Sequence, residues 1–146
     1  MLVKDALSER AEIVVIVQPD DTVTGVAKSL RDKRKGLAVV CDGQGAPLGL
    51  ISVIDISRAV AEQGDAAPQM AARSAMNTAF VSSRMDDKVD HALEVMAEHN
   101  IRHLPVLDEG KLAAVVSMRD LLQARQKEAE ISMEEMRRYV LGHGYS

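Results

Sequence analysis

Apolar and polar residues follow the same order in the two halves of the chain. Each half begins with a short apolar run that predicts a strand, at residues 13–17 and 79–82. The next segment has the 3-4 spacing of one helix face, and its apolar positions are Val23, Val26, Ala27 and Leu30 in the first half and Val89, Ala92, Leu93 and Met96 in the second. Two apolar runs joined by a polar turn then predict a hairpin, and a second amphipathic segment predicts a closing helix. Each half is therefore expected to fold in the order β-α-β-β-α.

The two halves also align at a constant spacing. The aspartate pair 20–21 matches the pair 86–87, which lies 66 positions further on, and each pair is placed to cap the helix that follows. A shorter second hairpin turn reduces the spacing to 65, so that a Ser-x-x-Asp motif occurs at matching places in both halves: Ser52 and Asp55, then Ser117 and Asp120. Such an internal repeat predicts two similar units.

This pattern predicts an α+β fold with two repeats and a C-terminal helical extension. The expected boundaries are 2–61 for the first repeat, 62–69 for a linker, 70–125 for the second repeat and 126–146 for the extension.

The extension carries apolar or long side chains at helical spacing, at Leu122, Arg125, Ala129, Met133, Met136 and Val140. This spacing allows one long helix that continues from the second repeat. Ser132 and Glu135 also form a capping-box pattern, which would start a separate helix instead. Either form would expose an apolar stripe, so we expect the extension to contribute to self-association.

Composition limits the classes of function. A net charge of −4 argues against nucleic-acid binding, which depends on clustered cations. The sequence has no apolar run of about 18 residues, so no membrane span is expected. The first ten residues lack the long apolar stretch of a signal peptide, and the single cysteine, Cys41, suits a reducing compartment, so we expect a cytoplasmic protein.

The repeated Ser-x-x-Asp motif has two interpretations. A serine at the end of a strand commonly caps the next helix, and an acid in the first turn suits the positive helix end. The same place can bind an anion through free N–H groups, while the carboxylate accepts hydrogen bonds from a ribose diol. One occurrence alone does not decide between capping and ligand binding.

The whole pattern resembles the cystathionine-β-synthase (CBS) domain family. The resemblance covers about residues 2–125 and is carried by "PDDTV" and "MDDKV", by "IRHLPVLD" and by the endings "LISVID" and "VVSMRD". It implies that two repeats pack around a pseudo-twofold axis and leave two clefts. Members of this family often bind AMP, ADP, ATP, NAD or S-adenosylmethionine in such clefts, and their modules often form homodimers.

The resemblance also implies site residues, which match this sequence position by position. In the second-repeat cleft they are Thr78, Phe80, Arg102, His103, Leu104, Pro105, Ser117, Arg119 and Asp120. In the first-repeat cleft they are Ser52, Asp55, Lys35, Val14 and Ala38. Ser117 and Arg119 are expected to face phosphate and Asp120 to hold the ribose.

The first repeat departs from the family pattern. Glu12 stands where the second repeat has Thr78, and an acid near a phosphate is repulsive. Ile54 stands where the second repeat has Arg119, which removes a cation. We therefore expect a phosphate-bearing ligand to prefer the second-repeat cleft.

Other chemistry is weaker. His99 and His103 are four residues apart, but a strand begins between them, so no metal site is expected. No nucleophile, base and orienting group converge in the sequence, which predicts a regulatory module rather than an enzyme. Its output is expected to act on an unknown protein partner in trans. The alternative is a structural or protein-interaction module with empty clefts.

Overall fold

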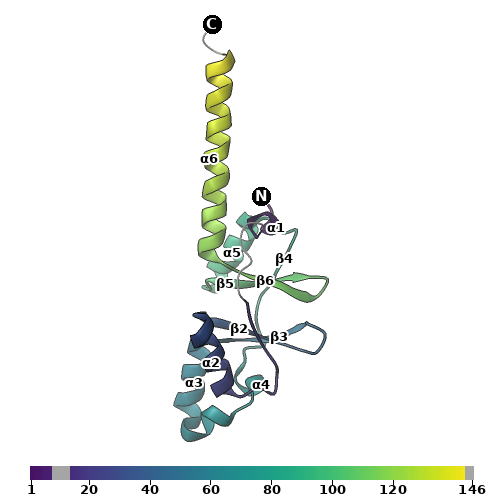
Figure 1. Cartoon of the computed structure of the whole chain (residues 1–146), viewed down its shortest axis with the longest axis vertical. Helices are drawn as coiled ribbons and strands as arrows, with labels where there is room; N and C mark the ends of the chain where they lie inside the picture. Colours follow the sequence, from purple (N-terminus) through teal and green to yellow (C-terminus); the bar gives the residue numbers. More distant parts are fainter. Residues whose placement is uncertain (8–13, 144–146) are drawn as a thin grey trace.

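The computed structural model describes residues 1–7 and 14–143, and it contains two α/β units stacked along one axis (Figure 1). The first repeat contains β1 (Val15–Val17), α2 (Val23–Lys33), β2 (Leu37–Cys41), β3 (Pro47–Ser52) and α3 (Val53–Gln63). The second contains β4 (Ser83–Arg84), α5 (Val89–His99), β5 (His103–Asp108), β6 (Lys111–Ser117) and α6 (Met118–His143). The predicted α+β fold of two β-α-β-β-α repeats is confirmed.

Both repeats contain a three-stranded sheet of the same topology. The first strand is parallel to the second, and the second is antiparallel to the third. Val17 lies opposite Val40 in the first sheet, and Ser83 lies opposite Val106 in the second, so the spacing of 66 holds in the strand register itself. The repeat in the sequence is therefore a repeat of backbone geometry.

The predicted strand at residues 79–82 is wrong, because β4 begins only at Ser83. The chain just before residue 79 pairs with β3 of the first repeat. Asn77 donates its N–H to the carbonyl of Leu50 at 2.8 Å, and Leu50 donates its N–H to the carbonyl of Asn77 at 3.0 Å. This pairing holds the segment beside β3 of the first repeat. In the first repeat, β1 begins at Val15, and Ile13 lies outside the described residues.

The helices α2 and α5 bury the apolar stripes that the sequence predicts. Most stripe positions are buried, and the others, Ala27 and Leu93, are partly buried. Both helices end at a residue in the left-handed conformation, Arg34 in α2 and Asn100 in α5. The chain therefore reverses in the same way before each central strand.

The predicted capping role of the aspartate pairs is wrong. Thr22 caps α2 and accepts the N–H of Gly25, while Lys88 precedes α5 without a side-chain cap. Asp21 accepts the N–H of Gln18 and Asp87 accepts that of Arg84, both at 2.8 Å. Each carboxylate instead accepts the N–H of the residue three positions before it, and so closes the turn that precedes the helix.

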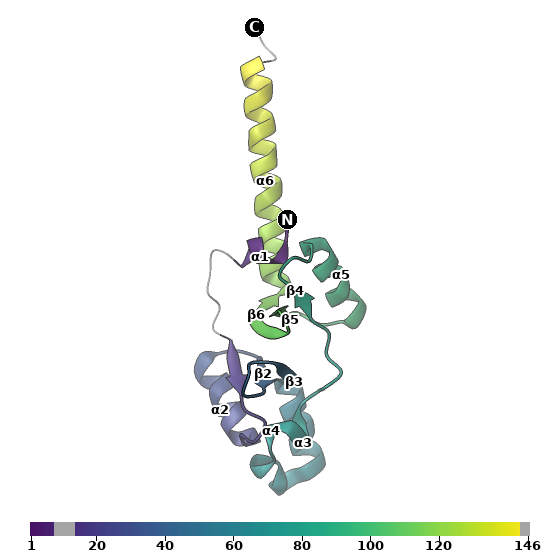
Figure 2. The ribbon, with the colours of Figure 1, turned by 90° about the vertical axis from the view of Figure 1, so that its right-hand side faces the viewer.

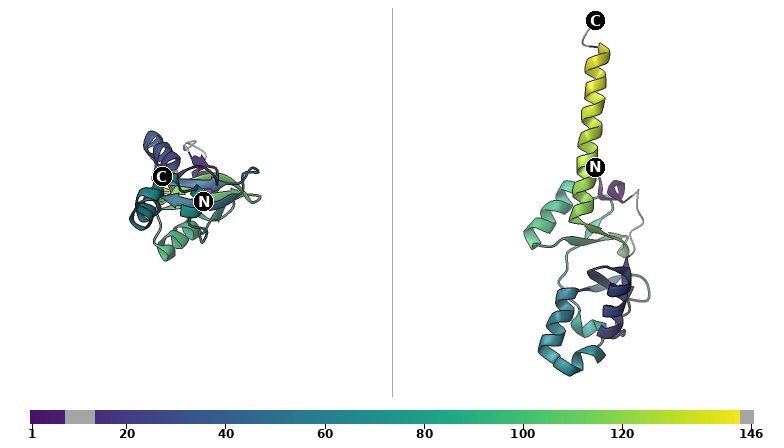
Figure 3. Two further views of the ribbon diagram at one scale, coloured as in Figure 1. Left: turned by 90° about the horizontal axis from the view of Figure 1, so that it is seen from below. Right: turned by 60° about the vertical axis from the view of Figure 1, so that its left-hand side comes forward.

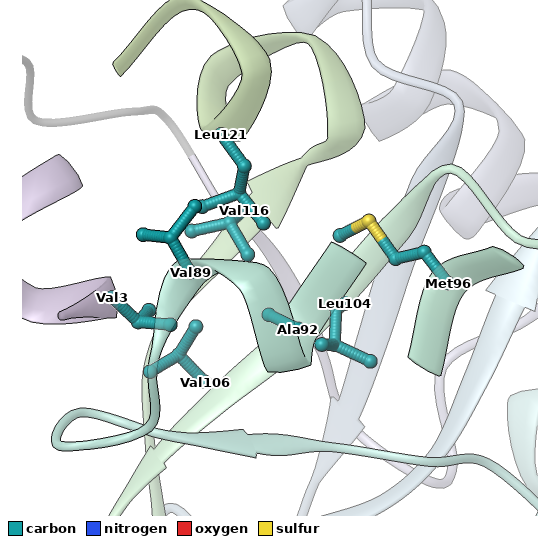
Figure 4. Close-up of a cluster of buried hydrophobic side chains, with 8 residues drawn as sticks. All are labelled: Val3, Val89, Ala92, Met96, Leu104, Val106, Val116 and Leu121. Carbon is teal, nitrogen blue, oxygen red and sulfur yellow. The ribbon is translucent and has the colours of Figure 1, made fainter. Parts of the chain in front are cut away.

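The structure contains two short helices that the sequence analysis did not predict. Each packs into the core of the other repeat and not into the core of the repeat that it precedes. The helix α1 (Val3–Ala6) precedes the first repeat, yet Val3 lies in the core of the second, beside Val89 and Val106 (Figure 4). The helix α4 (Ala72–Ala75) precedes the second repeat, yet Ala72 lies in the core of the first. Each repeat thus completes its core with a helix that lies next to the other repeat in sequence.

The two sheets also share a small core of their own. Val39 and Cys41 of β2 are buried together with Val115 of β6, and Leu50 and Leu112 pack against them. This cluster joins the repeats into one module. In Figure 2 the two sheets face each other across it, with helices on the outer sides.

The segment predicted as a linker contains a 3-10 helix, η1 (Gly64–Gln69). At the other end, α6 is one helix of 26 residues, so the prediction of a single helix is confirmed and that of a separate one is wrong. It projects well beyond the second repeat (Figure 3). Within residues 1–7 and 14–143, no helix is both long and apolar enough to cross a bilayer.

Candidate functional site

A cavity of about 340 Å³ lies where the two repeats meet. The first repeat contributes the start of β1 and the turn between α2 and β2, while the second contributes β5, β6 and the first turns of α6. Its lining residues are Val14, Val15, Lys35, Gly36, Leu37, His103, Val115, Ser117, Arg119, Asp120 and Gln123. The cavity therefore brings together residues of the two repeats that are 66 to 109 positions apart in the chain.

The Ser-x-x-Asp motif of the second repeat lies at this cavity because β6 ends there and α6 begins. Ser117 accepts the N–H of Asp120 at 3.0 Å, so the serine caps the helix. The N–H of Met118 is donated to the carbonyl of Arg102 at 2.8 Å. Two of the first N–H groups of α6 are thus occupied, and an anion in the cavity would depend mainly on side-chain cations.

Those cations come from both repeats. Lys35 follows the left-handed end of α2, and Arg119 lies in the first turn of α6. A phosphate between the two repeats could therefore be bound from both sides. The first turn of α6 also presents a carboxylate to the same space, that of Asp120. The cavity thus combines positive charge with one strong hydrogen-bond acceptor.

His103 responds to this charge arrangement. Burial lowers the pKa of His103 below its ordinary value, and repulsion from Lys35 lowers it further. The carboxylate of Asp120 acts in the opposite direction, and Arg102 adds a further lowering. His103 is therefore mainly neutral at neutral pH and would gain a proton more readily beside a bound anion.

A second hollow of about 540 Å³ adjoins the cavity on its outer side. It shares four residues with the cavity, and Arg102, Met118, Leu122 and Gln126 complete its lining. Arg102 thus lies beside the cavity rather than inside it. The apolar side chains of Met118 and Leu122 make this outer part the less polar one.

The structure groups several predicted site residues differently from the sequence analysis. Val14 and Lys35 were assigned to the first-repeat cleft, but they line the cavity with Ser117 and Asp120. Thr78 and Phe80 were assigned to the second-repeat cleft, but they are absent from that lining. The chain just before them pairs with Leu50 of β3, two residues from Ser52. The segment around Asn77 thus lies beside the first repeat, as α4 does.

Other predicted wall residues lie below the surface. Leu104 and Pro105 of β5 are fully buried, and Leu104 points into the core of the second repeat (Figure 4). Ala38 of β2 is fully buried in the core of the first repeat. These residues hold the strands in place, and a ligand in the cavity would not touch them directly. Glu12, which was expected to weaken the first-repeat cleft, lies outside the described residues.

The Ser-x-x-Asp motif of the first repeat forms a closed set of hydrogen bonds. Ser52 accepts the N–H of Asp55 at 3.2 Å, and Asp55 accepts both the N–H and the hydroxyl of Ser52, at 2.8 and 2.9 Å. Arg58 pairs with the other carboxylate oxygen at 3.1 Å. The carboxylate of Asp55 is thus used within its own helix end, which is the capping arrangement.

The predicted site residues did not include five that line the cavity, namely Val15, Gly36, Leu37, Val115 and Gln123. The spacing of 65 places Gln123 at the position of Arg58, and this correspondence was the available signal. A neutral Gln123 cannot form with Asp120 the ion pair that Arg58 forms with Asp55. Val115 supplies apolar surface to the cavity and belongs to the core shared by the two sheets.

Cys41 and His99 lie in surroundings that limit their reactivity. Burial raises the pKa of the Cys41 thiol, and the nearby charge of Asp42 raises it further, so the thiol stays protonated and weakly nucleophilic. The Nδ1 atom of His99 lies 3.0 Å from the carbonyl of Val95, on its own helix. Among the residues that the structure describes, no three His, Cys, Asp or Glu side chains gather as metal ligands do.

The repeat of topology agrees with the match of a family model to each half of the chain. The sequence model of the CBS domain matches residues 4–62 and 72–127. This chain belongs to the CBS domain family.

Solved structures of CBS domain proteins share its fold. A CBS-domain containing protein from Agrobacterium tumefaciens is 34% identical, with a TM-score of 0.77 over 86% of this chain and 99% of that one. A CBS domain protein from Pyrobaculum aerophilum, solved in complex with AMP, is 31% identical, with a TM-score of 0.75 over 91% of this chain and 99% of that one.

Among curated proteins, an uncharacterized protein from Methanopyrus kandleri is 29% identical over 127 residues, which are 86% of this chain and 65% of that protein. The chain spans less than two thirds of the length of the first curated relatives that it matches.

Proposed function

We propose that this CBS pair is a non-catalytic regulatory module that binds an adenosine-containing ligand in the cavity between its repeats. One observation carries the proposal: a single cavity presents Ser117 and Asp120 of one repeat together with Lys35 of the other and Arg119. This set matches the groups of a nucleotide, namely a diol and a phosphate. AMP, ADP, ATP, NAD and S-adenosylmethionine are the candidate ligands.

Each side chain has a role that its chemistry supports. The Asp120 carboxylate accepts hydrogen bonds from the two ribose hydroxyls, which are charge-assisted and therefore strong. Lys35 and Arg119 bind the phosphate, with the hydroxyl of Ser117 beside them. Val14 and Val115 offer apolar surface to the adenine ring, because they line the same cavity. The AMP complex of the relative from Pyrobaculum aerophilum supports this ligand class.

Regulation would follow from the position of the cavity. A ligand that contacts both repeats favours the arrangement of the repeats in which all these contacts are made. The size of this shift is set by how much more tightly the ligand binds that arrangement than any other arrangement. We further propose that the module forms a homodimer and that a separate protein partner responds to the favoured arrangement.

Thermal unfolding in the presence of each candidate ligand tests the proposal. A ligand that binds only the folded state at about 100 times its Kd stabilises that state by about 2.7 kcal/mol, which raises Tm by several degrees. Ribose 5-phosphate serves as the control, because it offers the diol and phosphate without adenine. If none of the five adenosine-containing ligands raises Tm, the proposal fails and a structural module with empty clefts is the better account.

A further inference from the structure

The C-terminal part of α6 exposes apolar side chains that the fold of the repeats does not use. From Arg125 to Gly142 every residue of the helix is exposed, and the segment projects away from the second repeat (Figures 1 and 3). Met133 is 68% exposed and Met136 is 69% exposed. Most helical stability in proteins comes from tertiary packing of an amphipathic face, so a partner surface would stabilise this segment.

The exposed residues form a seam with the period of a coiled coil. Successive steps of four and three residues connect Leu122, Gln126, Ala129, Met133, Met136 and Val140. This alternation averages 3.5 residues, which keeps one side of a helix facing a helical partner. A shallow hollow of about 300 Å³ runs along the distal end of the seam, between Met133, Met136, Arg137, Val140 and Leu141.

We propose that this seam, from Leu122 to Val140, pairs in parallel with the same seam of a second copy of the chain. The inference deepens the proposed homodimer, on which it rests, by naming the surface that joins the copies. A second copy is favoured because the charges beside the seam complement themselves. In a parallel pair Arg125 of one copy lies next to Glu130 of the other, on both sides of the seam. Arg125 also lies 3.3 Å from Asp90, and its guanidinium has donors for both carboxylates.

The parallel orientation follows from the polar residues. An antiparallel pair that covered the same seam would be centred near residue 131, so that Glu130 of the two copies would repel each other. It would also place Gln126 against Met136, so that the amide would lie in apolar surroundings with only its 3.4 Å bond to Glu130 of the same helix. In the parallel pair, Gln126 faces Gln126 of the second copy and the amides can bond to each other.

Sedimentation equilibrium on the full chain tests the seam with a matched pair of variants. Met133→Glu puts a carboxylate into the seam, where two copies would be buried against each other. Ile131→Glu makes the same change on the opposite face, where the side chain is 50% exposed. We expect the dimer Kd to rise about tenfold or more for Met133→Glu and to stay within about twofold of wild type for Ile131→Glu. Both positions lie outside the buried cores, so nucleotide-induced stabilisation of each variant should match wild type.

The outcomes separate this inference from the function proposed above. If the two variants weaken the dimer equally, or not at all, the seam is not the interface, while the homodimer stands. If the wild-type chain is monomeric throughout, both the seam and the homodimer fail, but ligand binding is judged by its own measurement. Oxidative cross-linking of Val140→Cys tests the orientation, since equal positions meet only in the parallel pair. A cross-link no stronger than that of Ile131→Cys would overturn the parallel arrangement. The native Cys41 is buried and serves as the background in wild type.

Discussion

The two Ser-x-x-Asp motifs are the same in sequence pattern and differ in what surrounds the carboxylate. Ser52 and Ser117 both cap a helix by accepting an N–H from the aspartate three residues later. In the first repeat the carboxylate of Asp55 also accepts from Ser52 and pairs with Arg58. In the second repeat Gln123 replaces the arginine, and Asp120 lines the cavity between the repeats.

This difference shows how one helix start can serve two purposes. Capping needs only the serine oxygen and one N–H, and both motifs satisfy it. Ligand binding needs in addition a cavity and complementary charge, which Lys35 and Arg119 supply near Asp120. Beside Asp55 the position of Arg119 is taken by Ile54, whose side chain is largely exposed. The motif therefore predicts a helix start, and its neighbours decide whether a ligand binds.

The largest expected effect comes from removing the two carboxylates. Asp120→Ala removes two charge-assisted hydrogen bonds to ribose, so nucleotide affinity should fall about tenfold to a thousandfold in titration calorimetry. Asp55→Ala removes the equivalent acid from a closed capping box and should lower the free energy of unfolding by about 1 kcal/mol without changing affinity. Equal affinities for the two variants would mean that both motifs only start helices.

Exchanging the next residue sharpens the comparison between the repeats. Arg119→Ile gives the second repeat the side chain of the first and removes a phosphate-binding cation. We expect the affinity for AMP to fall about tenfold and the affinity for adenosine to change little, since adenosine has no phosphate. The reverse change, Ile54→Arg, should leave both affinities at the wild-type level. An equal loss for AMP and adenosine would show that Arg119 does not bind the phosphate.

Lowering the pH should have smaller effects, which are opposite for two quantities: the stability of the fold should decrease and the affinity for AMP should increase. The pKa of His103 is lowered in the folded protein, so the unfolded chain binds the proton more tightly. The free energy of unfolding should therefore decrease as pH falls through the ordinary histidine pKa. A bound phosphate favours the protonated form of His103, so the affinity for AMP should rise by a few-fold as pH falls over the same range. His103→Gln controls for titration of the phosphate itself. The account of His103 is contradicted if wild type and variant share one affinity profile.

The smallest effect concerns the ends of the first helices. Arg34 and Asn100 occupy matching left-handed positions, with φ of 53° and 52°, and asparagine adopts this conformation more readily. Arg34→Asn should therefore raise the free energy of unfolding by a few tenths of a kcal/mol to about 1 kcal/mol in urea titration. Asn100→Arg should lower it by a similar amount. If the two changes have the same sign, the backbone conformation is not what distinguishes them.

Much of the fold was predictable because local rules determine it. The apolar stripes, the hairpins and the spacing of 66 follow from periodicity, and the strand register keeps that spacing. The helices α1 and α4 were missed because they have four residues each and are stabilised by the opposite repeat through Val3 and Ala72. Local periodicity carries no information about such an exchange.

The grouping of the candidate site residues was predictable only in part, because it depends on one helix start and also on the way the two repeats pack. Ser117, Arg119 and Asp120 lie around the start of α6, and His103 lies opposite Ser117 in the hairpin of β5 and β6, so their proximity could be expected from the sequence pattern. The neighbours of this set depend on how the two sheets pack, which brings the turn between α2 and β2 to the same cavity. Lys35, which the sequence analysis assigned to the first-repeat cleft, therefore lines the cavity with Asp120. The missed Gln123 was visible only by comparing the two repeats position by position.

A crystal structure of the chain with bound AMP tests the central claim most directly. The account predicts nucleotide in the cavity between the repeats, with both ribose hydroxyls on the carboxylate of Asp120 and the phosphate between Lys35 and Arg119. Unchanged contacts of Asp55 with Ser52 and Arg58 would complete this result. Nucleotide bound only beside Ser52 and Asp55, with the cavity at Asp120 empty, would contradict it.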